Sequence, residues 1–66
     1  MTKYIIIGVM PNRDKQYLTD HDGTTSNVWT SDRNEANVYC DYDMALGDWF
    51  EVAKRPFKRV FIARVN

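Results

Sequence analysis

The residues of this chain that could do chemistry are few and scattered. The densest polar group is the segment Asp20–Asn27, in which His21 stands between Asp20 and Asp22. A calcium loop needs oxygen ligands at alternate positions and a closing glutamate, and this segment has the two alternating aspartates without the glutamate. His21 is the only histidine, so a transition-metal site would need its other ligands from elsewhere. The sequence therefore predicts a solvated loop that binds no metal.

The candidate nucleophiles lack the neighbours that would activate them. Cys40 is the only cysteine, so it forms no intrachain disulfide, and a single thiol with a single histidine makes no convincing catalytic dyad. We expect Cys40 to be a small buried residue in a reducing, cytoplasmic setting. Ser26 and Ser31 lack a nucleophile-elbow motif, and the three glycines stand too far apart to form a phosphate-binding loop. With 66 residues, one small core fills the domain, and we expect no enzymatic activity and no cofactor.

The charges cancel in total but are unevenly distributed. Nine basic and nine acidic side chains give a formal net charge of zero. Residues 16–53 hold eight of the nine acidic side chains and one of the nine basic ones, whereas residues 54–66 hold five basic side chains and no acidic one. Such asymmetry bears on the choice of partner more than on the fold.

The basic segment Lys54–Arg59, "KRPFKR", has two interpretations. Cations suit the end of a helix, where they meet its negative dipole, and the segment then only joins a helix to a strand. Alternatively, the cations bind phosphates while the aromatic ring stacks on a base. The zero net charge and the acidic middle of the chain argue against nucleic acid, which we keep as the alternative hypothesis. Its residues are Lys54, Arg55, Phe57, Lys58 and Arg59.

The acidic middle of the chain also has two interpretations. Its carboxylates can form an ordinary hydrated surface with helix-capping roles. They can also form a surface that attracts a basic partner, with aromatic residues as anchors. The candidate partner-binding residues are Trp29, Asp32, Asp41, Asp43 and Asp48.

The apolar pattern predicts several short strands. The runs Lys3–Met10 and Lys58–Val65 are continuously apolar at their centres, which is typical of strands buried on both faces, and we expect them to be central neighbours in a sheet. The residues between them predict a turn at Pro11–Lys15, strands at Gln16–Thr19 and Val28–Thr30, one helical turn at Ser31–Ala36 and a strand at Ala36–Cys40.

The one predicted helix covers Asp43–Arg55. Its apolar stripe consists of Leu46, Trp49, Phe50 and Ala53, at helical spacing, and we expect this stripe to face the sheet while Asp48 and Glu51 stay exposed. Asp41 can cap the helix, and Pro56 should end it, because the residue before a proline avoids helical geometry.

These elements predict one α+β domain over residues 1–66. Their order is β-β-(β)-turn-β-α-β, with one amphipathic helix across an antiparallel sheet of about four strands. The sequence contains no apolar run of membrane-spanning length, and its start lacks a signal-peptide pattern. A sheet this small has open edges, so we also consider a structural subunit that dimerises through one of them.

The order of the segments resembles that of very small proteins encoded by bacteriophages. The matching pieces are Lys3–Ile7, Tyr17–Thr19, Trp29–Ala36 and Val60–Val65, which include "KYIII", "YLT" and "WTSDRNEA". The resemblance implies an accessory role, in which such a protein binds and inhibits or redirects a host enzyme or defence complex. Our leading hypothesis is accordingly a non-enzymatic factor that binds a basic host protein through an acidic surface with aromatic anchors.

Overall fold

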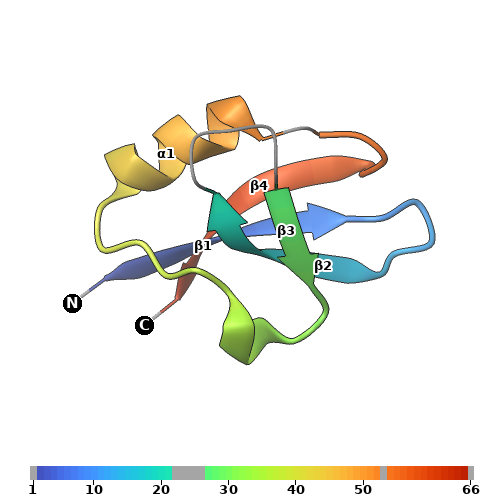
Figure 1. Ribbon diagram of the computed structural model, residues 1–66, viewed down its shortest axis with the longest axis horizontal. Helices are drawn as coiled ribbons and strands as arrows, with labels where there is room; N and C mark the ends of the chain where they lie inside the picture. The colour runs from blue at the N-terminus through green and yellow to red at the C-terminus, as the bar shows by residue number, and fades with distance from the viewer. Residues whose placement is uncertain (1, 22–26, 53, 66) are drawn as a thin grey trace.

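The sheet has four antiparallel strands and carries one helix on one face (Figure 1). The structure is a computed structural model that describes residues 2–21, 27–52 and 54–65, without the side chains of residues 20, 21, 27 and 28. The strands lie in the order β3-β2-β1-β4. The predicted α+β class is therefore confirmed. The elements are β1 (Lys3–Val9), β2 (Lys15–His21), β3 (Asn27–Thr30), the 3₁₀ turn η1 (Arg33–Glu35), α1 (Tyr42–Glu51) and β4 (Arg59–Val65).

Strand β1 is the centre of the sheet. Ile5, Ile6 and Ile7 are all buried, as the continuous apolar run predicts. β1 pairs with β2 on one side, through the expected hairpin, and with β4 along its whole length on the other. The two apolar strands are thus neighbours, but the prediction that both are central is wrong for β4. Strand β2 pairs with one edge of β1, and β3 extends the sheet beyond β2. Strand β4 pairs with the other edge of β1 and is therefore an edge strand of the sheet.

The predicted strand Ala36–Cys40 is wrong, because the segment makes only an isolated bridge to β1 and one backbone hydrogen bond to β2, of 2.8 Å from the N–H of Asn37 to the carbonyl of Leu18. Tyr39 bridges Tyr4 of β1, with a backbone hydrogen bond of 2.8 Å in each direction. β2 pairs with β1 only as far as Ile7, and the segment occupies the place that β2 leaves beside Tyr4. Cys40, expected to be buried, is exposed. The alternating pattern of Ala36–Cys40 therefore reflects a single buried side chain, that of Tyr39, and not a strand.

Helix α1 begins within one residue of its predicted start, but it is shorter than predicted. It is also turned about its own axis relative to the predicted orientation, so that other side chains face the sheet. The carboxylate of Asp41 caps it by accepting a hydrogen bond of 2.9 Å from the backbone N–H of Asp43. It ends at Glu51, well before Pro56, so the proline is not what stops it. Ala45 and Val52 are buried against the sheet, whereas Phe50 is 69% exposed, so its predicted burial is wrong. Ala53, the last residue of the predicted stripe, lies outside the described residues.

The rotation follows from the size of the side chains at the contact. Ala45 is fully buried, since a methyl group lets the helix approach the central strands closely. Larger residues then fall to the side of α1 that overlies β4, where Trp49 and Leu46 are only partly buried. In the part of the chain that the structure describes, no helix is long and apolar enough to cross a membrane.

Candidate protein-binding surfaces

Helix α1 presents an acidic surface to solvent. Asp41, Asp43 and Glu51 are exposed on it, and Met44 lies among them with 65% of its surface exposed. We call these four residues the acidic helix face. Asp41 and Glu51 lie three residues before and seven residues after Met44, on its side of the helix. An exposed, unbranched apolar side chain beside carboxylates suits contact with a partner that carries both cations and a small apolar patch.

Asp48 borders this face but also has a structural role. Its carboxylate accepts a hydrogen bond of 2.6 Å from the hydroxyl of Tyr39, which is buried in the core. A short hydrogen bond to a carboxylate is among the stronger ones in proteins. Asp48, which the sequence predicted to stay exposed, is therefore only partly exposed, and its hydrogen bond joins α1 to the segment before it.

The structure separates the other two residues of the acidic hypothesis from this face. Asp32 caps η1 by accepting a hydrogen bond of 2.9 Å from the N–H of Asn34. The neighbouring Glu35 accepts a hydrogen bond of 3.0 Å from the hydroxyl of Thr30. Trp29 lies on β3, away from the start of α1 (Figure 1). Of the five candidate residues, the structure thus places Asp41, Asp43 and Asp48 together.

Trp29 contacts a residue of the competing hypothesis. Its ring packs on that of Phe57, with the ring centroids 4.4 Å apart. Phe57 in turn lies directly over Gly8 of β1, where a methyl group would come within 2.6 Å of the phenyl ring. The two aromatic side chains therefore close one end of the core, and both are partly buried against it.

The cations of the basic segment are exposed, and some of them also contact their own chain. The ammonium group of Lys54 donates a hydrogen bond of 2.6 Å to the carbonyl of Trp49 and lies 4.2 Å from the centre of its ring. Arg59 lies over the ring of Phe61, 4.7 Å from its centre. Lys58 is exposed, and its backbone N–H bonds to β1. Two of the four cations thus contact residues of their own chain.

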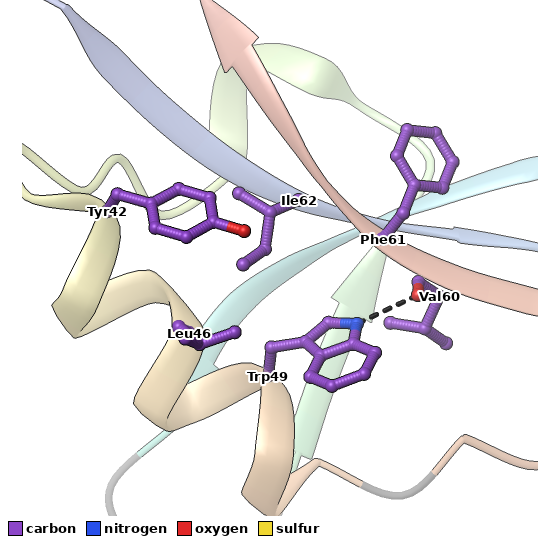
Figure 2. Close-up of a pocket in the computed structure, with 6 residues that line it drawn as sticks. All are labelled: Tyr42, Leu46, Trp49, Val60, Phe61 and Ile62. Carbon is purple, nitrogen blue, oxygen red and sulfur yellow. Dashed lines mark hydrogen bonds between the residues drawn. The ribbon is translucent and has the colours of Figure 1, made fainter.

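A third surface lies where α1 overhangs the edge strand β4 (Figure 2). A cavity of about 290 Å³ opens there, lined by Tyr42, Leu46, Trp49, Val60, Phe61 and Ile62. The indole N–H of Trp49 donates a hydrogen bond of 2.8 Å to the carbonyl of Val60 and so joins the helix to the edge strand. Figure 2 shows the side chains of Leu46 and Ile62 turned toward this opening and the ring of Phe61 turned away from it.

The exposure of Met44 and Tyr42 and the place of Ile62 beside the cavity were not predicted from the sequence. Helical spacing predicted an apolar stripe that includes Leu46, but only the rotation of α1 decides which side chains reach the core. Among the residues that the structure describes, no group of three or more histidine, cysteine, aspartate or glutamate side chains is placed to hold a metal ion.

Comparisons of the chain with models of protein families, with curated proteins and with solved structures gave no match.

Proposed function

We propose that this chain is a non-enzymatic binding protein that occupies a basic surface of another protein with its acidic helix face. The observation that carries the proposal is the exposure of Met44 among Asp41, Asp43 and Glu51 on one short helix. Helix α1 is anchored to the sheet by its buried side and by hydrogen bonds at Asp48 and Trp49. A rigid array of carboxylates speeds association with a basic partner by electrostatic steering and loses little entropy on binding.

The resemblance to bacteriophage accessory proteins suggests the kind of partner. The proposed role is to inhibit or redirect a host protein, in host takeover or against a defence system. The partner would carry lysine or arginine side chains around a small apolar pocket that accepts Met44. The interface would be small, because the acidic helix face covers only about three turns of helix.

The experiment is a pull-down from bacterial lysate followed by a kinetic comparison with purified partner. Met44→Lys should weaken binding at least about tenfold by raising the dissociation rate, as the loss of a central contact does. Asp43→Lys should mainly slow association, and that effect should shrink as salt rises. Asp14→Lys, which makes the same charge change in the turn between β1 and β2, is the control and should leave both rates nearly unchanged.

Nucleic acid is the competing outcome of the same work. Binding to single-stranded or duplex DNA should be no tighter than about 10 µM at physiological salt, which is weaker than specific recognition requires. Submicromolar DNA binding that is abolished by reversing Lys58 and Arg59 to glutamate would overturn the proposal. Equal binding of the partner by Met44→Lys and the unchanged protein would also overturn it.

A further inference from the structure

Strand β4 leaves alternate backbone groups without a partner in the sheet. Tyr4 directs both its N–H and its C=O to Tyr39, so the pair Tyr4–Arg64 is one in which neither residue bonds across the β1–β4 ladder. The same holds for every second residue, so Val60, Ile62 and Arg64 direct their N–H and C=O groups away from β1, toward the open edge. The hydrogen bond from the Trp49 indole to the Val60 carbonyl agrees with this alternation.

The edge lies directly below a row of apolar side chains. Tyr42 is 47% exposed and Phe50 is 69% exposed, and Leu46 and Trp49 line the cavity beside them. Together with Val60 and Ile62 they form what we call the β4–α1 flank. Long, apolar edge strands are sites of pairing with another chain unless something covers them. The other edge strand, β3, has only four residues.

We propose that a second copy of this chain covers the β4–α1 flank, so that two β4 strands pair antiparallel around a two-fold axis at Ile62. In this register Ile62 pairs with its own copy, and Val60 pairs with Arg64 of the second copy. Each of these residues directs its N–H and C=O to the edge, so about six new backbone hydrogen bonds can form. The Val60 carbonyl can accept one of them while keeping the indole bond, because a carbonyl oxygen has two lone pairs.

The position of α1 fits the same axis along the strand. Trp49 bonds to Val60, and the ring of Tyr42 contacts that of Tyr4, the residue paired with Arg64; we therefore place these two helix residues about level with Val60 and Arg64. The midpoint between Trp49 and Tyr42, close to Leu46, therefore lies level with Ile62. The two-fold axis at Ile62 would thus relate the two paired strands and also place the middle of one helix opposite the middle of the other.

The spacing of the two helices fits as well. Helix α1 contacts both β1 and β4, and a helix axis midway between the two strands would lie about 2.4 Å inside β4. Two β4 strands about 4.8 Å apart then place the helix axes about 10 Å apart, the upper end of ordinary helix packing. Leu46 and Phe50 from each copy would fill the cavity beside the other.

The charges at the two ends of the helix are complementary in this arrangement. The helices run antiparallel, so the start of one, with Asp41 and Asp43, lies near the end of the other, where Lys54 rests on the Trp49 ring. Each copy has no net charge, so long-range repulsion does not oppose the pairing. A strand of seven residues is about 23 Å long, which makes a modest interface with dissociation in the micromolar range.

The test is sedimentation equilibrium of the whole chain from about 5 to 500 µM, a range that brackets a micromolar dissociation constant. The expected result is a reversible rise from 7.8 kDa to twice that mass. Phe50→Glu should raise the dissociation constant at least about tenfold, since it places a charge in the centre of the helix contact. Val38→Glu is the matched control, because Val38 is also an exposed apolar residue but lies next to Tyr39, on the side of β1 away from β4, and it should change the constant less than about twofold.

A second variant tests the strand contact itself. Arg64→Pro removes an N–H group that faces the open edge, and proline is tolerated at such positions, so the monomer should fold and the dimer should weaken. In a mixed sample of labelled and unlabelled chains, the register predicts a contact between the Hα atoms of Phe61 and Ala63 of different copies. A monomer at every concentration, or a dimer that neither Phe50→Glu nor Arg64→Pro weakens, would overturn the proposal. The test is independent of the partner-binding proposal, because it involves no other protein.

Discussion

Replacing Gly8 or Gly47 with alanine should change the stability of the protein in opposite directions. At Gly47 a methyl group would meet nothing within 4 Å, and the residue lies in the middle of α1. Alanine is favoured over glycine inside a helix by about 1 kcal/mol, so Gly47→Ala should stabilise the fold by nearly that amount. For a domain of this size the corresponding rise in Tm is roughly 4–8 °C.

At Gly8 the same methyl group would collide with Phe57. The added carbon would lie 2.6, 2.7 and 3.0 Å from three atoms of the phenyl ring, whereas carbon atoms in contact are normally about 3.5–4.0 Å apart. The ring must therefore retreat by about 1 Å, and Trp29, with its ring centroid 4.4 Å away, restricts its movement. Overpacking of this kind costs about 1–3 kcal/mol, which exceeds the roughly 0.5–1 kcal/mol gained by removing a glycine from a strand.

The net prediction for Gly8→Ala is a loss of about 1–2 kcal/mol and a fall in Tm of roughly 4–16 °C. Thermal unfolding followed by circular dichroism measures both variants, and tryptophan emission reports on the Trp29–Phe57 contact. Phe57→Leu, introduced with Gly8→Ala, should recover part of the loss, because the smaller side chain leaves room for the methyl group. A Gly8→Ala protein that melts at or above the temperature of the unchanged protein would refute the packing of Phe57 on Gly8.

Three further substitutions test single hydrogen bonds, each by urea unfolding monitored at two wavelengths. Trp49→Phe keeps an aromatic ring but removes the donor to the Val60 carbonyl, and it should cost about 1–2 kcal/mol. Tyr39→Phe removes the hydroxyl that bonds to Asp48 and should cost about 1.5–3 kcal/mol, because the acceptor is charged; a loss below measurement error would contradict that bond. Asp41→Ala removes the cap of α1 and should cost about 1 kcal/mol, whereas Asp41→Asn should retain most of the stability, and equal losses in the two variants would argue against capping.

The sequence predicted the elements that depend on local patterns. The isoleucine run of β1 indicates a strand buried on both faces, and the turn after Pro11 makes the β1–β2 hairpin the obvious connection. The aspartate cap fixes the start of α1, because the side chain satisfies a backbone N–H that the helix itself cannot. These features need no knowledge of distant residues, and for that reason they were confirmed.

The features that the sequence missed depend on partners far along the chain. The alternation in Ala36–Cys40 is compatible with a strand, but a strand also needs a neighbour along its length, and this segment bonds to the sheet only at Tyr4 and at the Leu18 carbonyl. The contact between Trp29 and Phe57 joins residues that are distant in sequence and separated by α1. Periodicity also favours the largest apolar residues, so it placed Phe50 in the core, although the helix approaches the sheet through small Ala45.

Two hydrogen bonds, one on each flank of α1, fix the rotation of the helix about its axis, and removing both should have a different effect from removing either one. Tyr39 bonds to Asp48 on one flank of the helix, and Trp49 bonds to Val60 on the other. While either bond remains, the helix should keep its rotation. When both are removed, α1 can turn about its axis and bury Phe50 at the expense of Ala45.

The double variant Tyr39→Phe/Trp49→Phe should therefore lose less stability than the sum of the single losses, because burying Phe50 recovers apolar contact worth about 1.5–3 kcal/mol at most. The same turn would remove Phe50 from the β4–α1 flank, so self-association should fall much more in the double variant than in either single one. Urea unfolding gives the first quantity and sedimentation equilibrium the second. Strictly additive losses with unchanged self-association would show that packing of Ala45 and Val52 alone holds the helix, and that the two hydrogen bonds do not set its rotation.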